Sequence, residues 1–214
     1  MVSNIVIDSN LTSKAERWDQ RFAAEPGSWF FGRTPSFMAQ QVTALWNDLR
    51  PGETPTVLDL GCGEGRDAVW FARQGWPITA VDISIEGVKK TERLASEYGV
   101  TIAKLIHCDI LRFLPTETYN IVFAGSSLHG LGEECMPCLS RLQEATPLGG
   151  LNAIRLMSTT AEGPEDVGHL YRVEPGELIA QYIGWRLLDT SENTVCILRT
   201  GRYHSFSELI AQKV

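Results

Sequence analysis

The sequence predicts an α/β fold in which a doubly wound, mostly parallel sheet carries helices on both faces. Short apolar, β-branched runs alternate with amphipathic helical patterns along most of the chain. One of these runs, residues 56–60, ends in three glycines at alternate positions and leads directly into a helical pattern. Near the C-terminal end, runs at 185–191, 194–200 and 206–211 have short connections, which favour antiparallel pairing.

Between these two regions, strand and helix patterns alternate, and several helices have a recognisable start or stop. Gly75 ends the helical pattern that begins at Arg66, and Ser84 and Gly99 bracket the next one. We therefore expect a seven-stranded, mostly parallel sheet that closes with antiparallel C-terminal strands. The other predicted strands are 77–81, 102–106, 119–124 and 151–157, and the other predicted helices are 66–74, 133–145 and 175–183.

The first fifty residues precede the predicted sheet and contain two helical patterns, at 11–24 and 35–49. Thr34 is the expected N-cap of the second, with Pro35 as its first residue. No internal repeat or low-complexity linker divides the chain. We therefore predict one domain, residues 1–214, with a helical cap over residues 1–50 and a core over residues 51–214.

The composition excludes several classes of partner. With 43% hydrophobic and 21% charged residues, the chain resembles ordinary globular proteins. A net charge of −7 argues against a nucleic-acid partner, because binding phosphate backbones requires basic patches. No apolar window approaches the length of a membrane-spanning helix, and a signal-peptide pattern is missing, so no membrane association is expected. Five scattered cysteines suit a reducing compartment, which predicts a cytoplasmic protein.

Cys135 and Cys138 have the spacing of a redox pair or of half a metal site. A tetrahedral zinc site would need a second such pair or a suitably spaced pair of histidines, and the sequence offers neither. Both cysteines also fall within a helical pattern. We therefore favour a packing role for them and predict no metal site.

The glycines after residues 56–60 predict a nucleotide or nucleoside site. Gly61, Gly63 and Gly65 remove the Cβ atoms at a strand-to-helix turn, so the backbone can turn sharply and its N–H groups can face a ligand. A dinucleotide fingerprint would read G-x-G-x-x-G, but Arg66 occupies the place of its last glycine. Asp59, two residues before the first glycine, can accept hydrogen bonds from a cationic ligand or orient the amides of the loop.

Two further positions carry ionisable groups where ligands of open α/β sheets bind. Asp82 ends the second strand of the core, where a carboxylate can accept hydrogen bonds from both ribose hydroxyls; the alternative is an acid at a helix start. His129 lies in the loop after residues 119–124, which we expect to face the reacting centre. It is either a general base or a structural histidine, and the sequence leaves both open.

These motifs resemble the class I S-adenosylmethionine-dependent methyltransferases, and in particular a small-molecule branch that includes tellurite-resistance and thiopurine-type enzymes. The resemblance is carried by residues 61–67 and, more weakly, by residues 18–22, 31–35 and 203–213. It implies a Rossmann-like fold and S-adenosyl-L-methionine as the cofactor. The residues implied in cofactor binding are Asp59, Gly61, Cys62, Gly63, Gly65, Asp82, Ile83, Asp109, Ile110 and Ser126, where Asp109 and Ile110 would meet the adenine.

The resemblance also implies a small methyl acceptor, such as a thiol or a metalloid oxyanion, that displaces the methyl group in line. Trp29 and Phe30 are candidates to stack on the substrate, although packing of the cap is an equal alternative. Arg33, Arg172 and His204 are candidates to hold an anionic acceptor, against the ordinary alternative of solvated surface charges.

Two other functions remain open at this point. A nicotinamide-dependent oxidoreductase would share the strand, loop and helix and also Asp82, but Asp59 and Arg66 count against it. A non-catalytic S-adenosylmethionine-binding protein would retain every cofactor motif. The sequence is compatible with a monomer or a homodimer.

Overall fold

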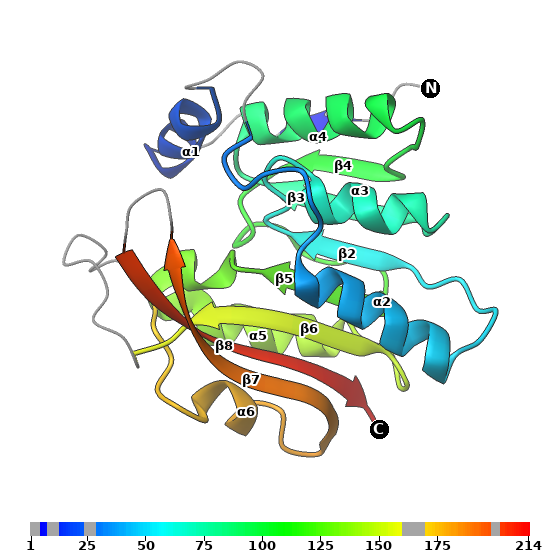
Figure 1. Ribbon diagram of the computed structural model, residues 1–214, viewed down its shortest axis with the longest axis vertical. Helices are drawn as coiled ribbons and strands as arrows, with labels where there is room; N and C mark the ends of the chain where they lie inside the picture. Colours follow the sequence, from blue (N-terminus) through cyan, green and yellow to red (C-terminus); the bar gives the residue numbers. More distant parts are fainter. Residues whose placement is uncertain (1–4, 8–12, 24–28, 160–169, 198–201) are drawn as a thin grey trace.

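In the computed structural model, helices cover both faces of one mixed sheet (Figure 1). The structure describes residues 5–7, 13–23, 29–159, 170–197 and 202–214. Among these, β1 to β6 run parallel to one another, whereas β8 pairs antiparallel with β6 and β7. In sheet order the strands are β1 (Ile5–Ile7), β4 (Lys104–His107), β3 (Ile78–Asp82), β2 (Val57–Leu60), β5 (Ile121–Gly125), β6 (Leu151–Met157), β8 (Arg202–Lys213) and β7 (Trp185–Ile197).

This topology confirms the predicted fold class. Strands β2 to β8 are the seven strands of the predicted sheet, and the short β1 extends it at one edge beside β4. One strand prediction was wrong: residues 185–191 and the first part of the strand predicted at 194–200 belong to the single strand β7, while residues 198–200 lie outside the described residues. Glu192 and Asn193 continue the pairing with β8 instead of forming a turn, and a register shift between Leu187 and Asp189 lets the long strand bend.

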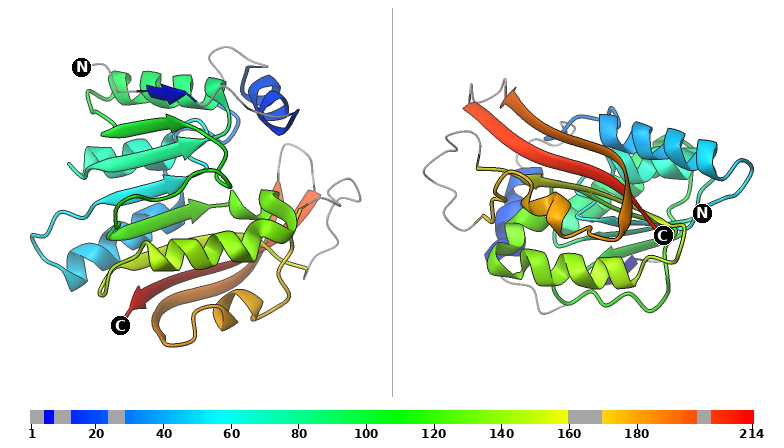
Figure 2. Two further views of the ribbon diagram at one scale, coloured as in Figure 1. Left: turned by 180° about the vertical axis from the view of Figure 1, so that it is seen from behind. Right: turned by 90° about the horizontal axis from the view of Figure 1, so that it is seen from below.

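The helices lie in two layers. Helices α2, α3 and α4 cover one face, and α5 and α6 cover the other (Figures 1 and 2). Each layer packs an apolar stripe against the buried strands, which read as continuous apolar runs because both of their faces are covered. The bounds are α1 (Ser13–Ala23), α2 (Phe37–Leu49), α3 (Arg66–Arg73), α4 (Ile85–Glu97), the 3₁₀ helix η1 (Leu128–Glu134), α5 (Cys135–Glu144) and α6 (Glu177–Ala180).

Three helix boundaries differ from the prediction. Ser36, not Thr34, is the N-cap of α2, because its hydroxyl accepts a hydrogen bond from the Ala39 amide at 3.1 Å. The helix predicted at 133–145 begins as the end of η1 and becomes α-helical only at Cys135, so α5 covers Cys135–Glu144; the kink at Gly132 lies inside η1, before the predicted helix. The helix predicted at 175–183 is a single turn, α6, that starts only after Gly176 adopts a positive φ of 80°.

The two helices of the predicted cap lie in different places. Helix α1 lies beyond the carboxyl ends of the parallel strands and packs beside α4 (Figure 1). Helix α2 instead packs on the sheet, where Val42 and Trp46 join the core. The N-terminal segment thus places one helix over the edge of the sheet where ligands of such folds bind. The division into a cap of residues 1–50 and a core of residues 51–214 stays a prediction.

Candidate functional site

The glycine loop joins β2 to α3, and all three of its glycines have positive φ angles between 56° and 87°. A Cβ atom at Gly61 would lie 2.2 Å from the Ser127 Cβ atom, and one at Gly65 would lie 2.6 Å from the Thr91 hydroxyl oxygen. These two glycines therefore let the loop pack against its neighbours. A Cβ atom at Gly63 would meet only the Phe22 ring of α1, at 3.6 Å. The loop thus has a packed side and a side that faces α1.

Asp82 at the end of β3 joins this loop to α4. One carboxylate oxygen accepts a hydrogen bond from the Gly63 amide at 2.7 Å, and the other accepts from the Ser84 amide at 2.8 Å. Burial raises the pKa of Asp82 to about 6, against the opposing effect of these amides. The Ile83 amide also contributes a backbone hydrogen bond. A carboxylate has about four acceptor positions, so acceptor capacity remains for further donors such as ribose hydroxyls. The next residue, Ile83, is partly exposed at the same strand end.

Asp59 on β2 is a buried carboxyl group with an unsatisfied oxygen. Its side chain is 2% exposed, and its Oδ2 atom has no hydrogen-bond partner among the described residues. Burial raises its pKa well above the usual value, and the nearby charges of Asp67 and Asp82 raise it further. A group in this state gains free energy from a cation or a hydrogen-bond donor placed beside it.

Asp109 and Ile110 follow β4 and lie at the same edge of the sheet. The Asp109 carboxylate accepts a hydrogen bond from the Leu111 amide at 3.0 Å, so it caps the local turn. The side chain of Ile110 would lie 3.6 Å from a Cβ atom at Gly61, which brings this segment beside the glycine loop. Cys62, the remaining predicted residue of that loop, is buried, and burial raises the pKa of its thiol well above the usual value.

The loop after β5 completes this edge. Ser126 has a φ of 90°, an unfavourable angle for a residue with a side chain. The hydroxyl of Ser127 donates a hydrogen bond to the Leu60 carbonyl and thereby holds the loop against the end of β2. Backbone strain of this kind persists where the surrounding structure over-determines the conformation, and it is concentrated at functional sites.

His129 lies in η1, directly after this loop. Burial, together with the smaller effects of the positive charges of Arg155, His204 and Lys14, lowers its pKa to about 4. The imidazole is therefore uncharged at neutral pH, and its Nδ1 atom has no hydrogen-bond partner within the described part of the chain. Its environment suits a positioning group or hydrogen-bond partner better than a strong base.

Arg155 on β6 is a candidate site residue that the sequence analysis did not name, and its charge acts on His129. Its guanidinium forms an ion pair with Glu208 of β8 at 3.0 Å and lies 3.8 Å from the centre of the Phe206 ring. The two strands are antiparallel with Arg155 opposite Glu208. The alternation of His204, Phe206 and Glu208 puts all three on one face of β8. This alternation is visible in the sequence, but the sequence does not show which residues of β6 and β8 lie opposite each other.

The predicted substrate residues separate into two groups. His204 influences the pKa of His129, and the Tyr171 amide donates to the His129 carbonyl at 2.8 Å, which brings the segment of Arg172 beside η1. By contrast, Arg33 forms an ion pair with Glu97 on the outer side of α4. The ring of Trp29 lies 5.2 Å from the Arg33 guanidinium, so it belongs to that surface too.

Phe30 belongs to an aromatic cluster that covers the glycine loop. Its ring lies 4.7 Å from Phe31 and 6.5 Å from Phe22 of α1, centre to centre. The neighbouring backbone is bound to the loop itself: the Phe31 amide donates to Glu64 at 3.2 Å, and Arg66 donates to the Phe31 carbonyl at 3.1 Å. Aromatic side chains and the glycine loop are therefore parts of one site.

The described residues offer neither a metal site nor a membrane-spanning helix. They contain no group of three or more His, Cys, Asp or Glu side chains that could hold a metal ion, and no helix long and apolar enough to cross a membrane. Cys135 and Cys138 are buried in α5, and burial raises the pKa of Cys135 to about 12. Both thiols are therefore protonated at neutral pH and pack in the core, in agreement with the interpretation favoured above.

Comparisons with curated proteins give several similar relatives. A probable S-adenosyl-L-methionine-dependent methyltransferase TehB from Haemophilus influenzae (strain 10810) is 26% identical over 138 residues, covering 64% of this chain and 48% of that protein. An uncharacterized methyltransferase from Mycobacterium tuberculosis (strain ATCC 25618 / H37Rv) is 31% identical over 112 residues, covering 52% of this chain and 55% of the other. The chain spans about half the length of these curated relatives.

Solved structures share the fold. The crystal structure of TehB from Haemophilus influenzae superposes with a TM-score of 0.73 at 19% identity, over 92% of this chain and 67% of that one. The 1,6-didemethyltoxoflavin-N1-methyltransferase of Burkholderia thailandensis, solved with 1,6-didemethyltoxoflavin and S-adenosylhomocysteine bound, gives a TM-score of 0.60 at 19% identity, over 98% and 94% of the two chains. The family model described as tellurite resistance protein TehB matches residues 38–204. This match confirms the predicted resemblance: the chain belongs to the TehB family.

Proposed function

We propose that this chain is an S-adenosyl-L-methionine-dependent methyltransferase that acts on a small acceptor molecule. One observation carries the proposal: the glycine loop, Asp82, and the segment of Asp109 and Ile110 meet at the carboxyl edge of the parallel strands. In open α/β sheets this edge is where nucleotides and nucleosides bind. Membership in the TehB family supports the same assignment.

The residues at this edge fit the proposed cofactor. The spare acceptor positions of Asp82 suit two ribose hydroxyls, and the Asp109–Ile110 segment offers a carboxylate and an apolar side chain to an adenine. The unsatisfied Oδ2 of Asp59 suits a positive ligand group. We assign the remaining cofactor contacts to the backbone of Gly61 to Gly65 and to Ile83 and Ser126.

When bound, the cofactor supplies a sulfonium methyl group, which an acceptor attacks in line as the charge is neutralised. The residues of the chain contribute position and a dry environment. Helix α1 and its aromatic side chains pack over the glycine loop, an arrangement that suits a dry site. The charge of Lys14 in α1 acts on both Asp109 and His129, which supports a position of this helix near the loops that follow β4 and β5.

We propose that the acceptor is a thiolate or a metalloid oxyanion, or a molecule of similar charge. Arg155 and His204 lie near His129, and the Arg172 segment adjoins it. An acceptor that is already anionic needs positioning more than proton removal. His129, with a pKa of about 4, is a weak base and suits that role, whereas an alcohol or amine acceptor needs a stronger one.

Turnover distinguishes this proposal from a non-catalytic binding protein. The purified protein is incubated with S-adenosyl-L-methionine and, separately, a low-molecular-weight thiol, selenite, tellurite and a small carboxylic acid. Mass spectrometry then follows S-adenosylhomocysteine and the methylated product. We expect stoichiometric formation of both with at least one acceptor and none with Asp82→Ala. Cofactor binding without product from any acceptor would favour the non-catalytic function.

The cellular setting follows from the chemistry of the chain. Cys62, Cys108, Cys135 and Cys138 are free thiols, which are typical of a reducing compartment. We therefore propose a cytoplasmic protein whose partner is its small-molecule substrate, without a nucleic-acid or membrane partner.

A further inference from the structure

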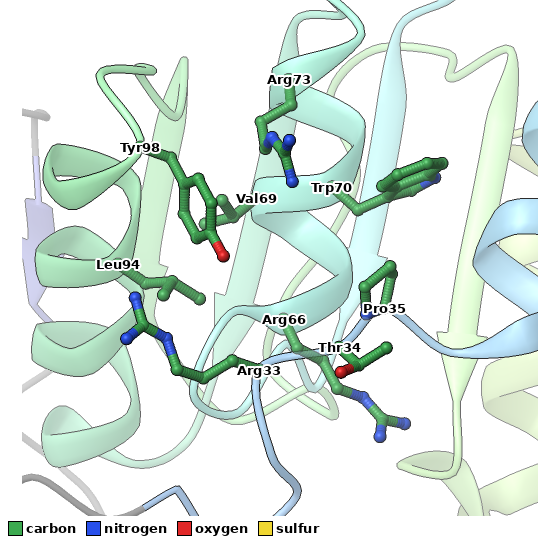
Figure 3. Close-up of a pocket in the computed structure, with 9 residues that line it drawn as sticks. All are labelled: Arg33, Thr34, Pro35, Arg66, Val69, Trp70, Arg73, Leu94 and Tyr98. Carbon is green, nitrogen blue, oxygen red and sulfur yellow. The ribbon is translucent and has the colours of Figure 1, made fainter.

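A pocket of about 200 Å³ lies on the outer side of the helical layer, between α3, α4 and residues 33–35 (Figure 3). Val69 of α3, Leu94 of α4 and Pro35 are among the apolar residues that line it. Of the residues at the glycine loop, only Arg66 also lines this pocket. The pocket is therefore a separate feature from the edge of the sheet where we place the cofactor.

The pocket is cationic in a chain that is acidic overall. Arg33, Arg66 and Arg73 line it without any Asp or Glu, although the net charge of the chain is −7. Two of these guanidinium groups already form ion pairs, Arg33 with Glu97 and Arg66 with Asp67 at 3.3 Å. Within the described ranges, no carboxylate pairs with Arg73. Arg73 is thus the group with charge available to a ligand.

One aromatic ring contacts this cation, and a second ring lines the same pocket. The Arg73 guanidinium lies 4.6 Å from the centre of the Tyr98 ring, and Figure 3 shows it between the side chains of Tyr98 and Trp70. The Trp70 ring is held in place because its Nε1 donates a hydrogen bond to the Thr43 hydroxyl at 3.0 Å. Tyr98 is 43% exposed, and the Arg33 guanidinium also lies near its ring, 5.7 Å from the centre. Stacking on the ring pre-organises the guanidinium and reduces the entropy lost on binding.

We propose that this pocket binds a planar aromatic carboxylate, with its ring against Tyr98 and Trp70 and its carboxylate on Arg73. The guanidinium fork matches a carboxylate with two parallel hydrogen bonds, while apolar and aromatic walls bury a ring. Pockets for drug-sized ligands have about 300 to 1,000 Å³, so this one suits a single ring. The inference is independent of the proposed methyl transfer, because it concerns binding at another surface.

The test is an NMR titration that reads the pocket directly. In ¹⁵N-labelled protein, the indole N–H signal of Trp70, assigned with Trp70→Phe, is followed while benzoate is added at constant pH and ionic strength. Benzyl alcohol tests the ring without the charge, and acetate tests the charge without the ring. We expect a saturable shift with benzoate and an affinity at least tenfold lower for each of the other two.

Two substitutions locate the binding. Arg73→Gln removes the cation from an exposed position, and we expect it to weaken benzoate binding about ten- to hundredfold while leaving benzyl alcohol unaffected. Tyr98→Leu removes the ring and should weaken benzoate and benzyl alcohol alike. Arg93→Gln is the matched control, because Arg93 stacks on Trp29 and does not line the pocket.

Three results would overturn the proposal. The first is no saturable shift with benzoate. The second is equal binding of acetate, which would mean that the arginines attract any anion. The third is benzoate binding that survives Arg73→Gln or is lost equally in Arg93→Gln.

Discussion

Ser126 has the least favourable backbone angle of the candidate site, with a φ of 90° directly after β5. Holding a non-glycine residue in such a region costs about 1 to 3 kcal/mol. We expect Ser126→Gly to raise the free energy of unfolding by about 1 kcal/mol in urea denaturation, after the entropic cost of glycine is deducted. Ser126→Ala keeps the strain and serves as the control. Equal stability of the two variants would show that the angle is not strained.

The carboxyl group of Asp82 should make cofactor binding depend on pH. Its pKa is raised from 3.8 to about 6 because it is buried. Ribose hydroxyls donate to the ionised form, so binding favours loss of the proton. We expect the affinity for S-adenosyl-L-methionine to rise with pH up to about 6 and then to level off. Calorimetry from about pH 5 to pH 8 measures this.

Asp82→Asn is the control for that profile and should flatten it, apart from any contribution of Asp59. The raised pKa of Asp82 also affects the stability of the fold, but in the opposite direction: cofactor affinity rises with pH, whereas stability falls. The folded state holds the Asp82 proton more tightly than the unfolded chain, so this group lowers stability as pH rises from about 4 to 6. If the affinity of the wild-type protein for S-adenosyl-L-methionine does not change from about pH 5 to pH 8, this result would contradict the role given to Asp82.

Arg155 should determine how well an anionic acceptor binds. Removing its charge with Arg155→Gln should raise KM for such an acceptor about tenfold or more, because a charge-assisted hydrogen bond is lost. The affinity for the cofactor should not change. Steady-state kinetics measure the first quantity and calorimetry the second. A variant with unchanged KM would place Arg155 outside the acceptor site, whatever its effect on stability.

The residues named from the sequence stand in short local motifs, whereas those that were missed depend on contacts between residues far apart in the sequence. Gly61 and Asp82 are found from local patterns, because each stands at a fixed offset from a strand end, whereas Asp109 is named through the family resemblance. The pair of Arg155 and Glu208 joins residues far apart in the sequence, through an antiparallel register that no local pattern specifies.

Helix α1 is attached to the core through α4, and this attachment should control access to the glycine loop. Asp19 accepts hydrogen bonds from the Ser84 hydroxyl at 2.5 Å and from the Glu86 amide at 3.2 Å. A carboxylate at this position also interacts favourably with the positive end of α4. Asp19→Asn should therefore loosen α1 and weaken cofactor binding about threefold to tenfold, with little change in the global free energy of unfolding.

Hydrogen exchange of the α1 amides measures the loosening, and calorimetry measures the affinity. Gln20→Ala is the matched control, since Gln20 is the exposed neighbour on the same helix. Faster exchange in α1 without loss of cofactor affinity would mean that this helix does not cover the site.

Elements with strong local signals were predicted well, and those that depend on tertiary contacts were not. The helix between Ser84 and Gly99 was recognised from its cap and its stop, and the structure has α4 there. The start of α2 was misplaced because Thr34 and Ser36 are both acceptable caps by residue type. β7 was divided in the prediction because Glu192 and Asn193 resemble a turn, whereas pairing with the long β8 keeps the strand extended.

For the whole molecule, the alternation of strand and helix patterns was sufficient to predict the sheet. Every parallel strand ends at the same edge, so one topology brings the loops after β2, β3, β4 and β5 together. The position of residues 29–36 was not predictable in this way. The contacts of Glu64, Arg66 and Asp67 with that segment use side chains of the glycine loop and α3, which the motif does not assign to packing.

The most direct test of the central claim is a calorimetric titration of the purified protein with S-adenosyl-L-methionine, S-adenosylhomocysteine and NAD. We predict micromolar binding of the first two, no binding of NAD, and loss of the binding in Asp82→Ala. Binding of NAD alone would contradict the methyltransferase function and favour an oxidoreductase. Binding of S-adenosyl-L-methionine that survives Asp82→Ala would contradict the site described here.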